Sequence, residues 1–599
     1  MPKIEQNFSF KSLFAPITTL KAVNIIVFLG LIVYCNALFN GFVWDDFPFI
    51  INDHQIQQFN LFALFGNTLF NSGLFYRPLD ALYFSSLYGL FGQFAFPYHL
   101  FQVTLHIVNA CFLFLFLKLL FSKNNALFLS LIFLVHPMNV ESVAYISATP
   151  SELYFMFGIT ALLLSTEQYL SQKRLFAIST FLLLSILSKE TGILFLFLIF
   201  AYRYIFKQGG LKKVALLGTA TVGIYFILRI FVGGVISTDQ GTLFPINTLS
   251  FSQRLINIPA ILIYYIKTFL LPLNLIVSQS WIVNTMSFKD FIAPLLFCLA
   301  ITLCLIYFTF VLKTYEKKQQ TQKKLLLQKV EFFTLWFIIG MSLILQLVPL
   351  DMTVADRWFY FPIVGLLGLL GVSIQMFQQQ VVRYKHIFIG GMIIILILLS
   401  IRTYVRVFNF KNNITLYAHD IKEDPNNTIL LDDLTTELFD ERKFKEALPY
   451  AIQSVSINPT LTNTSLLGSI YLSEGQYDKS YASYMQAIVE YNKDIARQHT
   501  SLQAVTLNQQ LDAIYSNLSL LNLLKQQPAT CIKFITGQAL KRFPSDPQLY
   551  LFLAIAEYET HNKQNAIKAV TYAYNLSPNT YTAYVYNQIQ NNLPIKFSQ

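Results

Sequence analysis

Charge is scarce in this 599-residue chain: Asp, Glu, Lys and Arg make up 13% of it, while 54% of its residues are hydrophobic. Soluble domains carry roughly 25% charged residues, so a soluble multidomain enzyme and a disordered chain are excluded. There are only five cysteines and no CxxC pair, which excludes a disulfide-stapled secreted scaffold and a zinc knuckle. What remains is a polytopic membrane protein with room for a soluble appendage.

Apolar stretches dominate residues 1–410, and a helical crossing of a bilayer needs about 20 residues. We predict about eleven spans, at 22–39, 97–121, 125–146, 150–169, 174–188, 190–206, 212–232, 291–312, 330–349, 357–377 and 386–406. A further apolar stretch, 255–276, is interrupted by Pro259 and Pro272. A crossing there would move the later basic loops to the opposite side, so we expect this stretch to lie along the outer interface or to re-enter, walling a cavity.

The net charge is 43 − 32 = +11, and its distribution indicates the orientation. Basic clusters flank the predicted spans at Lys118 and Lys123, Lys173 and Arg174, Arg203 to Lys213, Lys313 to Lys329, and Arg383 and Lys385. All of these fall on one side, which the positive-inside rule assigns to the cytoplasm. A nucleic-acid partner is therefore not needed to explain the charge. We expect the first span to be a retained signal anchor, with the C-terminal region outside the cytoplasm.

Residues 411–599 show helical spacing of apolar residues and a repeat of about 34 residues, the length of a tetratricopeptide (TPR) unit. The clearest copies align Leu431, Leu434, Ala447 and Pro459 with Tyr550, Leu553, Ala566 and Pro578. A third copy contains Leu467, Gly468, Tyr471 and Ala487, and a degenerate one runs from Leu511 to Pro544. We predict a TPR solenoid, whose concave face would bind an acceptor polypeptide or serve only as a structural cap.

The candidate catalytic and substrate-binding residues also lie on the predicted outer side. The stretch 40–55, NGFVWDDFPFIINDHQ, places two adjacent acids, Asp45 and Asp46, in an outer loop of residues 40–96. Adjacent carboxylates repel, so one of them can serve as a general base, although an Asp at a helix N-cap is the plainer alternative. Three cations, Arg77, Lys189 and Arg357, lie on the same side. Each has an acid nearby for structural pairing, but together they favour an anionic, phosphate-containing substrate.

These motifs, in order, resemble a known family. WDD after the first span, YRPL at 76–79, HPMNVE at 136–141, SKE at 188–190 and DRWFYFP at 356–362, followed by TPRs, are similar to those of the TPR-containing transmembrane O-mannosyltransferases and their bacterial relatives. More distantly, they resemble the GT-C class of glycosyltransferases. The resemblance implies an all-α, GT-C-like membrane helix bundle at 1–410 and a C-terminal TPR α-solenoid at 411–599.

The resemblance also implies an activity: transfer of mannose or another hexose from a polyprenyl-phosphate carrier to an acceptor hydroxyl, Ser or Thr of a protein, at the non-cytoplasmic face. Asp45 would be the base and Asp46 would position the acceptor or the sugar. The substrate and lipid-phosphate site would include Arg77, Lys189, Arg357, His136, Glu141, Glu190 and Tyr360.

We expect a single, inverting displacement with no metal and no cofactor beyond the lipid-linked donor, because a pair of adjacent Asp residues is not the spaced DxD commonly used to hold a metal. The sequence departs from the family pattern at Thr149 and Pro150, where relatives usually carry a basic residue.

Two other functions stay open at this point: a non-enzymatic TPR scaffold or assembly protein, and a lipid or solute transporter. A scaffold does not need Asp45, Asp46 and Arg357 together, and a transporter typically shows internal repeats in its membrane half. The composition suits a bacterial inner membrane with the TPR region in the periplasm, or the endoplasmic reticulum membrane in a eukaryote.

Overall fold

The computed structural model describes residues 17–68, 75–233, 245–315, 320–497 and 501–596. Across these residues the fold is all-α, as predicted, and Gln279 and Val354 form an isolated bridge. The chain divides into two compact units, Met1–Glu423 and Asp424–Gln599. Helix α19 (Asn413–Glu423) thus belongs to the first unit, although the sequence change at residue 411 grouped it with the repeats.

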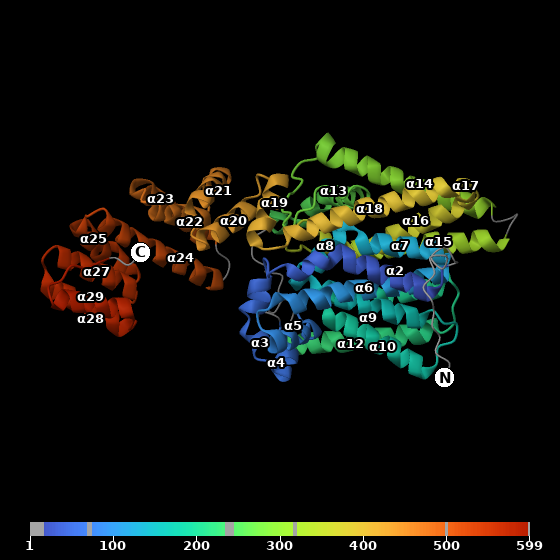
Figure 1. Ribbon diagram of the computed structural model, residues 1–599, viewed down its shortest axis with the longest axis horizontal. Coiled ribbons are helices and arrows are strands. Elements are labelled where there is room, and N and C mark those ends of the chain that lie inside the picture. The colour runs from blue at the N-terminus through green and yellow to red at the C-terminus, as the bar shows by residue number, and fades with distance from the viewer. Residues whose placement is uncertain (1–16, 69–74, 234–244, 316–319, 498–500, 597–599) are drawn as a thin grey trace, which may run out of the picture. The chain divides into compact units, whose positions relative to one another are not determined.

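The first unit is a bundle of long helices (Figure 1). Its principal members are α2 (Thr19–Tyr34), α5 (Pro78–Phe91), α6 (Ala95–Leu120), α7 (Lys123–Val135), α9 (Thr149–Ser165), α10 (Gln172–Ser188), α11 (Leu194–Ile205), α12 (Leu211–Gly233), α13 (Phe251–Leu270), α14 (Ala293–Tyr315), α15 (Gln320–Ser342), α16 (Ile363–Met376) and α18 (Lys385–Asn409). Each of the eleven predicted spans falls on one of these helices. The chain is a polytopic membrane protein.

Length and composition separate these helices into two groups. Within the described ranges seven helices are long and apolar enough to cross a bilayer, or eight if α7 and the following Pro137–Ala144, bent by 50°, form one broken span. Three other predicted spans coincide with shorter helices, namely α10, α11 and α16. The total of eleven crossings stays a prediction.

Two ends of the bundle differ in character. Ser122 and Ser171 cap α7 and α10 at the end that carries the basic loops, and Arg203 of α11 donates to the carbonyls of Ser165 and Glu167 there. At the other end the chain forms short elements instead: η1 (Cys35–Phe39), η2 (Phe47–Ile51), α8 (Val140–Ala144), η4 (Ile146–Ala148), η5 (Glu190–Ile193) and η9 (Asp356–Tyr360). The motifs singled out from the sequence therefore gather at one end of the bundle.

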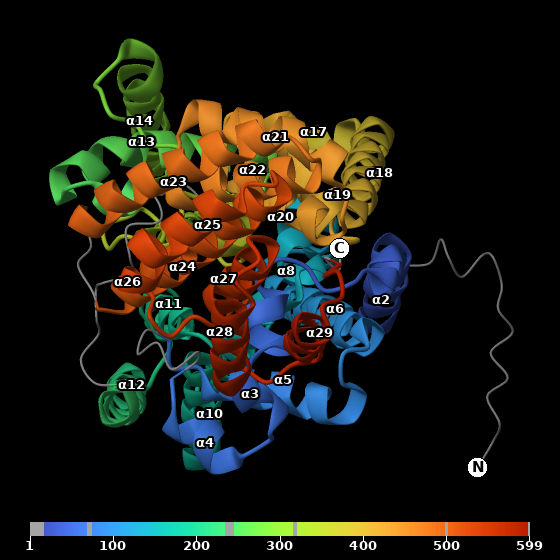
Figure 2. The ribbon, with the colours of Figure 1, turned by 90° about the vertical axis from the view of Figure 1, so that its left-hand side faces the viewer.

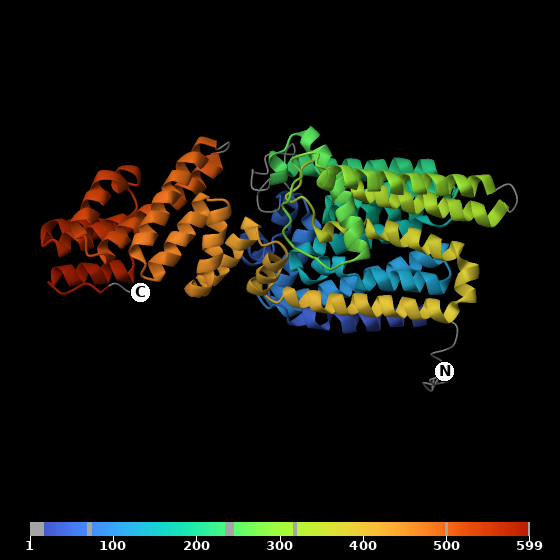
Figure 3. The ribbon, with the colours of Figure 1, turned by 90° about the horizontal axis from the view of Figure 1, so that it is seen from above.

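Helix α13 carries the stretch 255–276 that did not fit the span count. It contains Pro259 and ends at Leu270, and Figure 3 shows it running crosswise to the long helices. Tyr265 of α13 donates a hydrogen bond to the carbonyl of Ala355 at 3.1 Å, so the helix packs against the segment that leads into η9. A crosswise helix at the motif-bearing end is the arrangement expected of a segment that lies along a membrane face.

An aromatic core holds the middle of the bundle. Trp336 of α15 is buried among Phe116, Phe195 and Phe361. Its indole Nε1 donates to the carbonyl of Phe361 at 3.0 Å. Since Phe361 follows η9 directly, this bond fixes the position of the short helix that carries Arg357.

The second unit is built of paired helices (Figure 2). They are α20 (Thr428–Asp440), α21 (Phe444–Ile457), α22 (Leu461–Ser473), α23 (Tyr477–Arg497), α24 (Ser501–Leu524), α25 (Pro528–Phe534), η10 (Ile535–Ala539), α26 (Leu540–Arg542), α27 (Pro547–Glu559), α28 (Lys563–Leu576) and α29 (Thr580–Gln590).

The predicted small positions, Ala447 and Ala566, are fully buried in α21 and α28. A Cβ on Gly468 would lie 2.8 Å from the ring of Tyr484, so only glycine allows α22 and α23 to approach this closely. The predicted TPR solenoid is confirmed.

Candidate active site

A cavity of about 350 Å³, lined by charged as well as aromatic and aliphatic side chains and called the polar cavity below, lies at the motif-bearing end of the bundle. Its walls come from the loop after α2, from α5, from the start of α9, from η5, and from the segment between α15 and η9. The charged residues that line it are Asp45, Arg77, Asp80, Lys189, Glu190, Asp351 and Arg357. Five of the nine residues predicted for the site therefore meet in one cavity.

The two adjacent acids of the outer loop point in different directions. Trp44 adopts a positive φ of 51°, a left-handed conformation that bulky residues rarely adopt, and its amide donates to Asn413 Oδ1 at 2.7 Å. Asp45 lines the cavity, whereas Asp46 is fully buried behind the wall. The turn at Trp44 thus directs the Asp45 carboxylate into the cavity and the Asp46 carboxylate into the protein interior.

Asp45 is held by Tyr145. The Tyr145 hydroxyl donates to Asp45 Oδ2 at 2.8 Å, and Trp44 stacks on the Tyr145 ring with centroids 5.5 Å apart. Burial raises the pKa of Asp45, while the Tyr145 hydrogen bond and the positive charge of Arg357 oppose that rise. A carboxylate with a raised pKa that faces a cavity is suited to accept a proton near neutral pH.

Asp46 braces the loop. Its Oδ1 accepts from the Ser147 amide at 2.7 Å and from the Ser147 hydroxyl at 2.6 Å, and its Oδ2 accepts from the Val43 amide at 2.9 Å. Burial raises the pKa of Asp46 to about 7, although these hydrogen bonds act in the opposite direction. This geometry ties the acid loop to the η4 segment opposite it.

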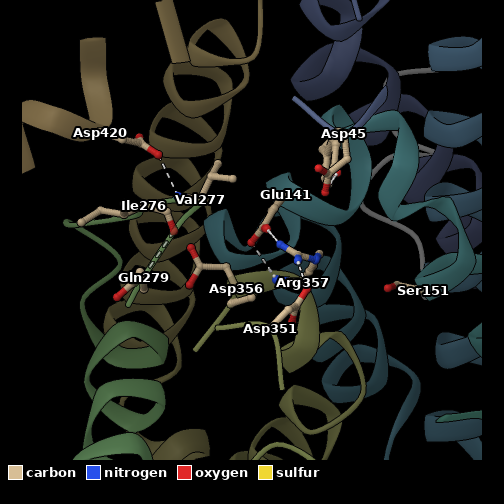
Figure 4. Close-up of polar contacts among 12 residues, drawn as sticks. Asp45, Glu141, Ser151, Ile276, Val277, Gln279, Asp351, Asp356, Arg357 and Asp420 are labelled. Carbon is tan, nitrogen blue, oxygen red and sulfur yellow. Dashed lines mark hydrogen bonds and ion pairs between the residues drawn. The ribbon is translucent and has the colours of Figure 1, made fainter. Parts of the chain in front are cut away.

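Arg357 reaches the cavity from η9 and is anchored by Glu141 of α8 (Figure 4). Its guanidinium pairs with Glu141 Oε1, its backbone amide donates to Glu141 Oε2 at 3.0 Å, and Asp351 Oδ2 lies 4.0 Å from the guanidinium. The guanidinium also lies 5.5 Å from the Trp44 ring centroid. Glu141 is buried and is absent from the cavity lining, so it holds Arg357 from behind.

The other two cations lie on a different wall. Arg77 precedes α5, and its Nε and Nη2 each lie 2.9 Å from Glu190 Oε2. Lys189 Nζ donates to Ser151 Oγ at 2.9 Å, and no ion pair of Lys189 is found among the described residues. Burial, together with the like charges of Arg77 and Arg357, lowers the pKa of Lys189 to about 7. A half-buried cation with a lowered pKa is stabilised in its charged form by an anionic ligand.

His136 and Tyr360 lie behind the cavity wall. The His136 ring accepts from the Met138 amide at 3.3 Å, contacts the Phe269 carbonyl at 3.0 Å and stacks on the Phe269 ring. The Tyr360 hydroxyl accepts from Asn109 Nδ2 at 3.1 Å and lies 2.9 Å from His106 Nδ1. Both side chains are buried in helix packing and are absent from the cavity lining.

Sequence reasoning missed several residues of this cavity. Tyr145, Ser151 and Asp80 line it, but none was predicted as a site residue. The sequence held a signal for Asp80, because this acid follows the predicted site residue Arg77 by only three residues. Pro150, at the departure from the family pattern, also lines the cavity. The bond from Lys189 to the neighbouring Ser151 brings a cation to this part of the wall.

A second, larger and mainly apolar cavity of about 820 Å³ runs between α13, α14, α15 and α16. Its lining extends from Tyr204 and Ile205, at the basic end of the bundle, to Leu345. The neighbouring Leu343 and Ile344 line the polar cavity. The two cavities therefore approach one another along this stretch of chain.

No group of three or more His, Cys, Asp or Glu residues that could hold a metal ion is found within the described ranges. The expectation that the reaction needs no metal stays a prediction.

Comparison with known proteins bears on this site. The chain is similar to protein O-mannosyl-transferase TMTC3 of Homo sapiens, with 25% identity over 518 residues, which cover 78% of this chain and 55% of the relative. TMTC3 of Mus musculus (24% identity, 78% and 54% covered) and protein O-mannosyl-transferase F38B6.6 of Caenorhabditis elegans (24%, 73% and 62%) are also similar. The chain thus spans little more than half the length of these curated relatives, and no protein-family model matches it. The resemblance to TPR-containing O-mannosyltransferases is confirmed.

Solved structures give distant matches. They include the crystal structure of MamA protein, with a TM-score of 0.23 and 16% identity over 31% of this chain and 86% of that one. Another is YrrB, described as a TPR protein with an unusual peptide-binding site, with a TM-score of 0.23 and 11% identity over 29% of this chain and 82% of that one. At these scores the likeness carries no argument about function.

Proposed function

We propose that this protein is a membrane glycosyltransferase that moves mannose or another hexose from a polyprenyl-phosphate carrier to a Ser or Thr hydroxyl of a protein. The observation that carries this proposal is the polar cavity, where a half-buried carboxylate, Asp45, and three cations line one space. The similarity to protein O-mannosyltransferases supports a protein acceptor and mannose as the transferred sugar.

The proposed reaction is a single displacement at the anomeric carbon. Asp45 takes the proton of the acceptor hydroxyl as the acceptor oxygen bonds to the anomeric carbon. The bond from that carbon to the phosphate oxygen breaks, and the electron pair leaves with the polyprenyl phosphate. Because the acceptor attacks opposite to the departing phosphate, the product has the inverted configuration.

Arg357, Arg77 and Lys189 would stabilise the negative charge of the phosphate as it leaves. Lys189 suits this role because no carboxylate pairs with it among the described residues, so its charge is open to a ligand. Arg357 is oriented in advance by Glu141 and Arg77 by Glu190. A cation held in place before the reaction loses little freedom when the charge develops.

The apolar cavity would hold the polyprenyl chain. Leu345 lines the apolar cavity, and the adjacent Leu343 and Ile344 line the polar cavity. A lipid in the apolar cavity would therefore place its phosphate near the cations. We place the reaction at the non-cytoplasmic face, since the polar cavity lies opposite the basic loops. In a bacterium this face is the periplasmic side of the inner membrane, and in a eukaryote the lumen of the endoplasmic reticulum. The TPR unit would present the acceptor polypeptide.

The test is Asp45→Asn, which keeps the shape of the side chain but removes the base. Purified protein, a labelled polyprenyl-phosphate hexose and an acceptor peptide would be used, in buffer with EDTA because the proposed mechanism includes no metal. We expect transfer to fall roughly 10²- to 10⁴-fold, the usual contribution of a general base.

Asp53→Asn is the matched control. Asp53 lies in the same loop and caps the helix His54–Gln57 through a bond to the Gln55 amide, and Asn caps a helix equally well. It should retain wild-type transfer. Wild-type rates for Asp45→Asn would sink the catalytic assignment, and transfer that needs added Mg²⁺ would contradict the metal-free mechanism.

A further inference from the structure

Asp80 is a buried carboxyl group in the cavity wall that the proposed reaction does not use. It lies in the first turn of α5, and only 4% of its surface is exposed. Its Oδ1 is buried and has no hydrogen-bond partner among the described residues. A buried polar atom without a partner is uncommon in folded proteins and is costly, so it needs an explanation.

The dipole of helix α5 does not by itself explain why Asp80 is buried at this position. An acid in the first turn interacts favourably with the helix dipole, but Asp80 Oδ1 accepts no bond from the amides that begin α5. Arg77, Lys189 and Glu190 influence it only through their charge. Burial raises the pKa of Asp80 to about 8, so at neutral pH the group is mostly protonated and can both donate and accept a hydrogen bond.

The surroundings of Asp80 indicate what it would bind. Phe84 follows it by four residues, so the two side chains lie on one face of α5, and both line the cavity. Phe49 and Phe75 line the same cavity. A carboxyl group beside aromatic rings matches a pyranose, which has hydroxyls around its rim and an apolar face of C–H groups.

We infer that Asp80 hydrogen-bonds a hydroxyl of the transferred hexose, while Phe84 packs against the C–H face of the sugar. This subsite rests on the proposed function, since the sugar is the one that Asp45 and the cations would act on. A hydroxyl satisfies the carboxyl in either protonation state, whereas an ionised Asp80 would repel a phosphate. Asp80 is therefore a specificity-determining residue of the donor site.

The experiment pairs residue changes with changes of substrate. Wild type and Asp80→Ala are each assayed with the polyprenyl-phosphate hexose and with its series of monodeoxy analogues. In wild type, one analogue should lose roughly threefold to tenfold in kcat/KM, the worth of one hydrogen bond. Asp80→Ala should lose the same factor with the parent sugar and should no longer distinguish that analogue from the parent.

Two further variants keep the result interpretable. Asp80→Leu fills similar space without a polar atom and replaces Asp80→Ala if that protein folds poorly. Ser86 lies on the same helix and is absent from the cavity lining, and its hydroxyl donates to the Leu82 carbonyl. Ser86→Ala should therefore behave as wild type toward every analogue.

The outcomes separate the two proposals. Suppose that wild type transfers the sugar, and that Asp80→Ala and Asp80→Leu lose the same factors in kcat/KM with each analogue as wild type does. The subsite is then overturned and the proposed function stands. If wild type transfers no hexose from any polyprenyl phosphate, the proposed function is overturned and the subsite with it.

Discussion

Asp45 and Asp46 follow one another in the chain, yet only Asp45 faces the cavity. The positive φ at Trp44 and the three hydrogen bonds to Asp46 separate the two carboxylates. A strained turn of this kind persists only when its surroundings hold it, and such turns are frequent at functional sites. At the scale of the residue, the chain thus uses one acid to position its neighbour.

The protonation states of two residues predict a pH profile. Lys189 must be protonated to bind phosphate, and its pKa is lowered to about 7, so kcat/KM should fall as the pH rises above about 7. Asp45 must be ionised to act as the base, and burial raises its pKa above 3.8, so activity should also fall on the acid side. Bound phosphate raises the pKa of Lys189, so the alkaline limb of kcat should lie at higher pH than that of kcat/KM.

The variant Lys189→Arg tests whether Lys189 causes the fall of kcat/KM at high pH, because arginine stays charged over this range. The limb of kcat/KM should move to higher pH in this variant. The groups whose charges reach Lys189 are Arg77, Glu190, Asp351 and Arg357, and Asp80 also interacts with it. A limb that stays in place would show that a group other than Lys189 controls it.

At the scale of the element, the position of Arg357 depends on how α15 and α16 pack. Arg357 lies in η9, directly before α16. Gly368 of α16 faces Phe333 of α15, and a Cβ on Gly368 would lie 2.0 Å from the Phe333 ring. The close approach of these two helices therefore requires glycine.

Gly368→Ala should destabilise the bundle by about 1–3 kcal/mol, the usual cost of overpacking a core. The thermal midpoint of the protein in detergent should fall, and transfer should fall with it because η9 shifts. Gly390→Ala is the control, since a Cβ there meets nothing within 4 Å and alanine favours a helix. Equal midpoints for the two variants would contradict the packing argument.

At the scale of the whole molecule, the distribution of charge predicts the orientation in the membrane. The basic loops lie at one end of the bundle and the polar cavity at the other. In the predicted topology of eleven crossings, the chain after α18 and the cavity would lie on the same, non-cytoplasmic side. This arrangement would give the TPR unit access to the face where the acceptor is modified.

A topology experiment tests this arrangement. A reporter that is active only outside the cytoplasm should be active when fused after Gln599 and inactive when inserted after Lys207, between α11 and α12. The expectation follows from the positive-inside rule, because Arg203, Lys207 and Lys212 flank that loop. An inactive reporter after Gln599 would overturn the eleven-crossing topology and would separate the repeats from the cavity.

Much of this protein was predictable from local patterns. Hydropathy over about 20 residues located the membrane helices, and a repeat of about 34 residues identified the TPR unit. The orientation indicated by the basic residues stays a prediction. The cluster of Asp45, Arg77, Lys189 and Arg357 at one face followed from the same reasoning. These signals lie in short stretches of chain, where periodicity and composition suffice.

Only the tertiary structure decided which side chains face the cavity. It turned Asp45 inward and Asp46 away, joined Glu141 to Arg357 and buried His136 and Tyr360. It also left Asp80 Oδ1 in the wall without a hydrogen-bond partner among the described residues. The physical reason is that the direction and partner of a side chain depend on elements far apart in sequence. The sequence by itself therefore determined the class of protein and the end of the bundle where its chemistry lies, while long-range packing determined which groups can act there.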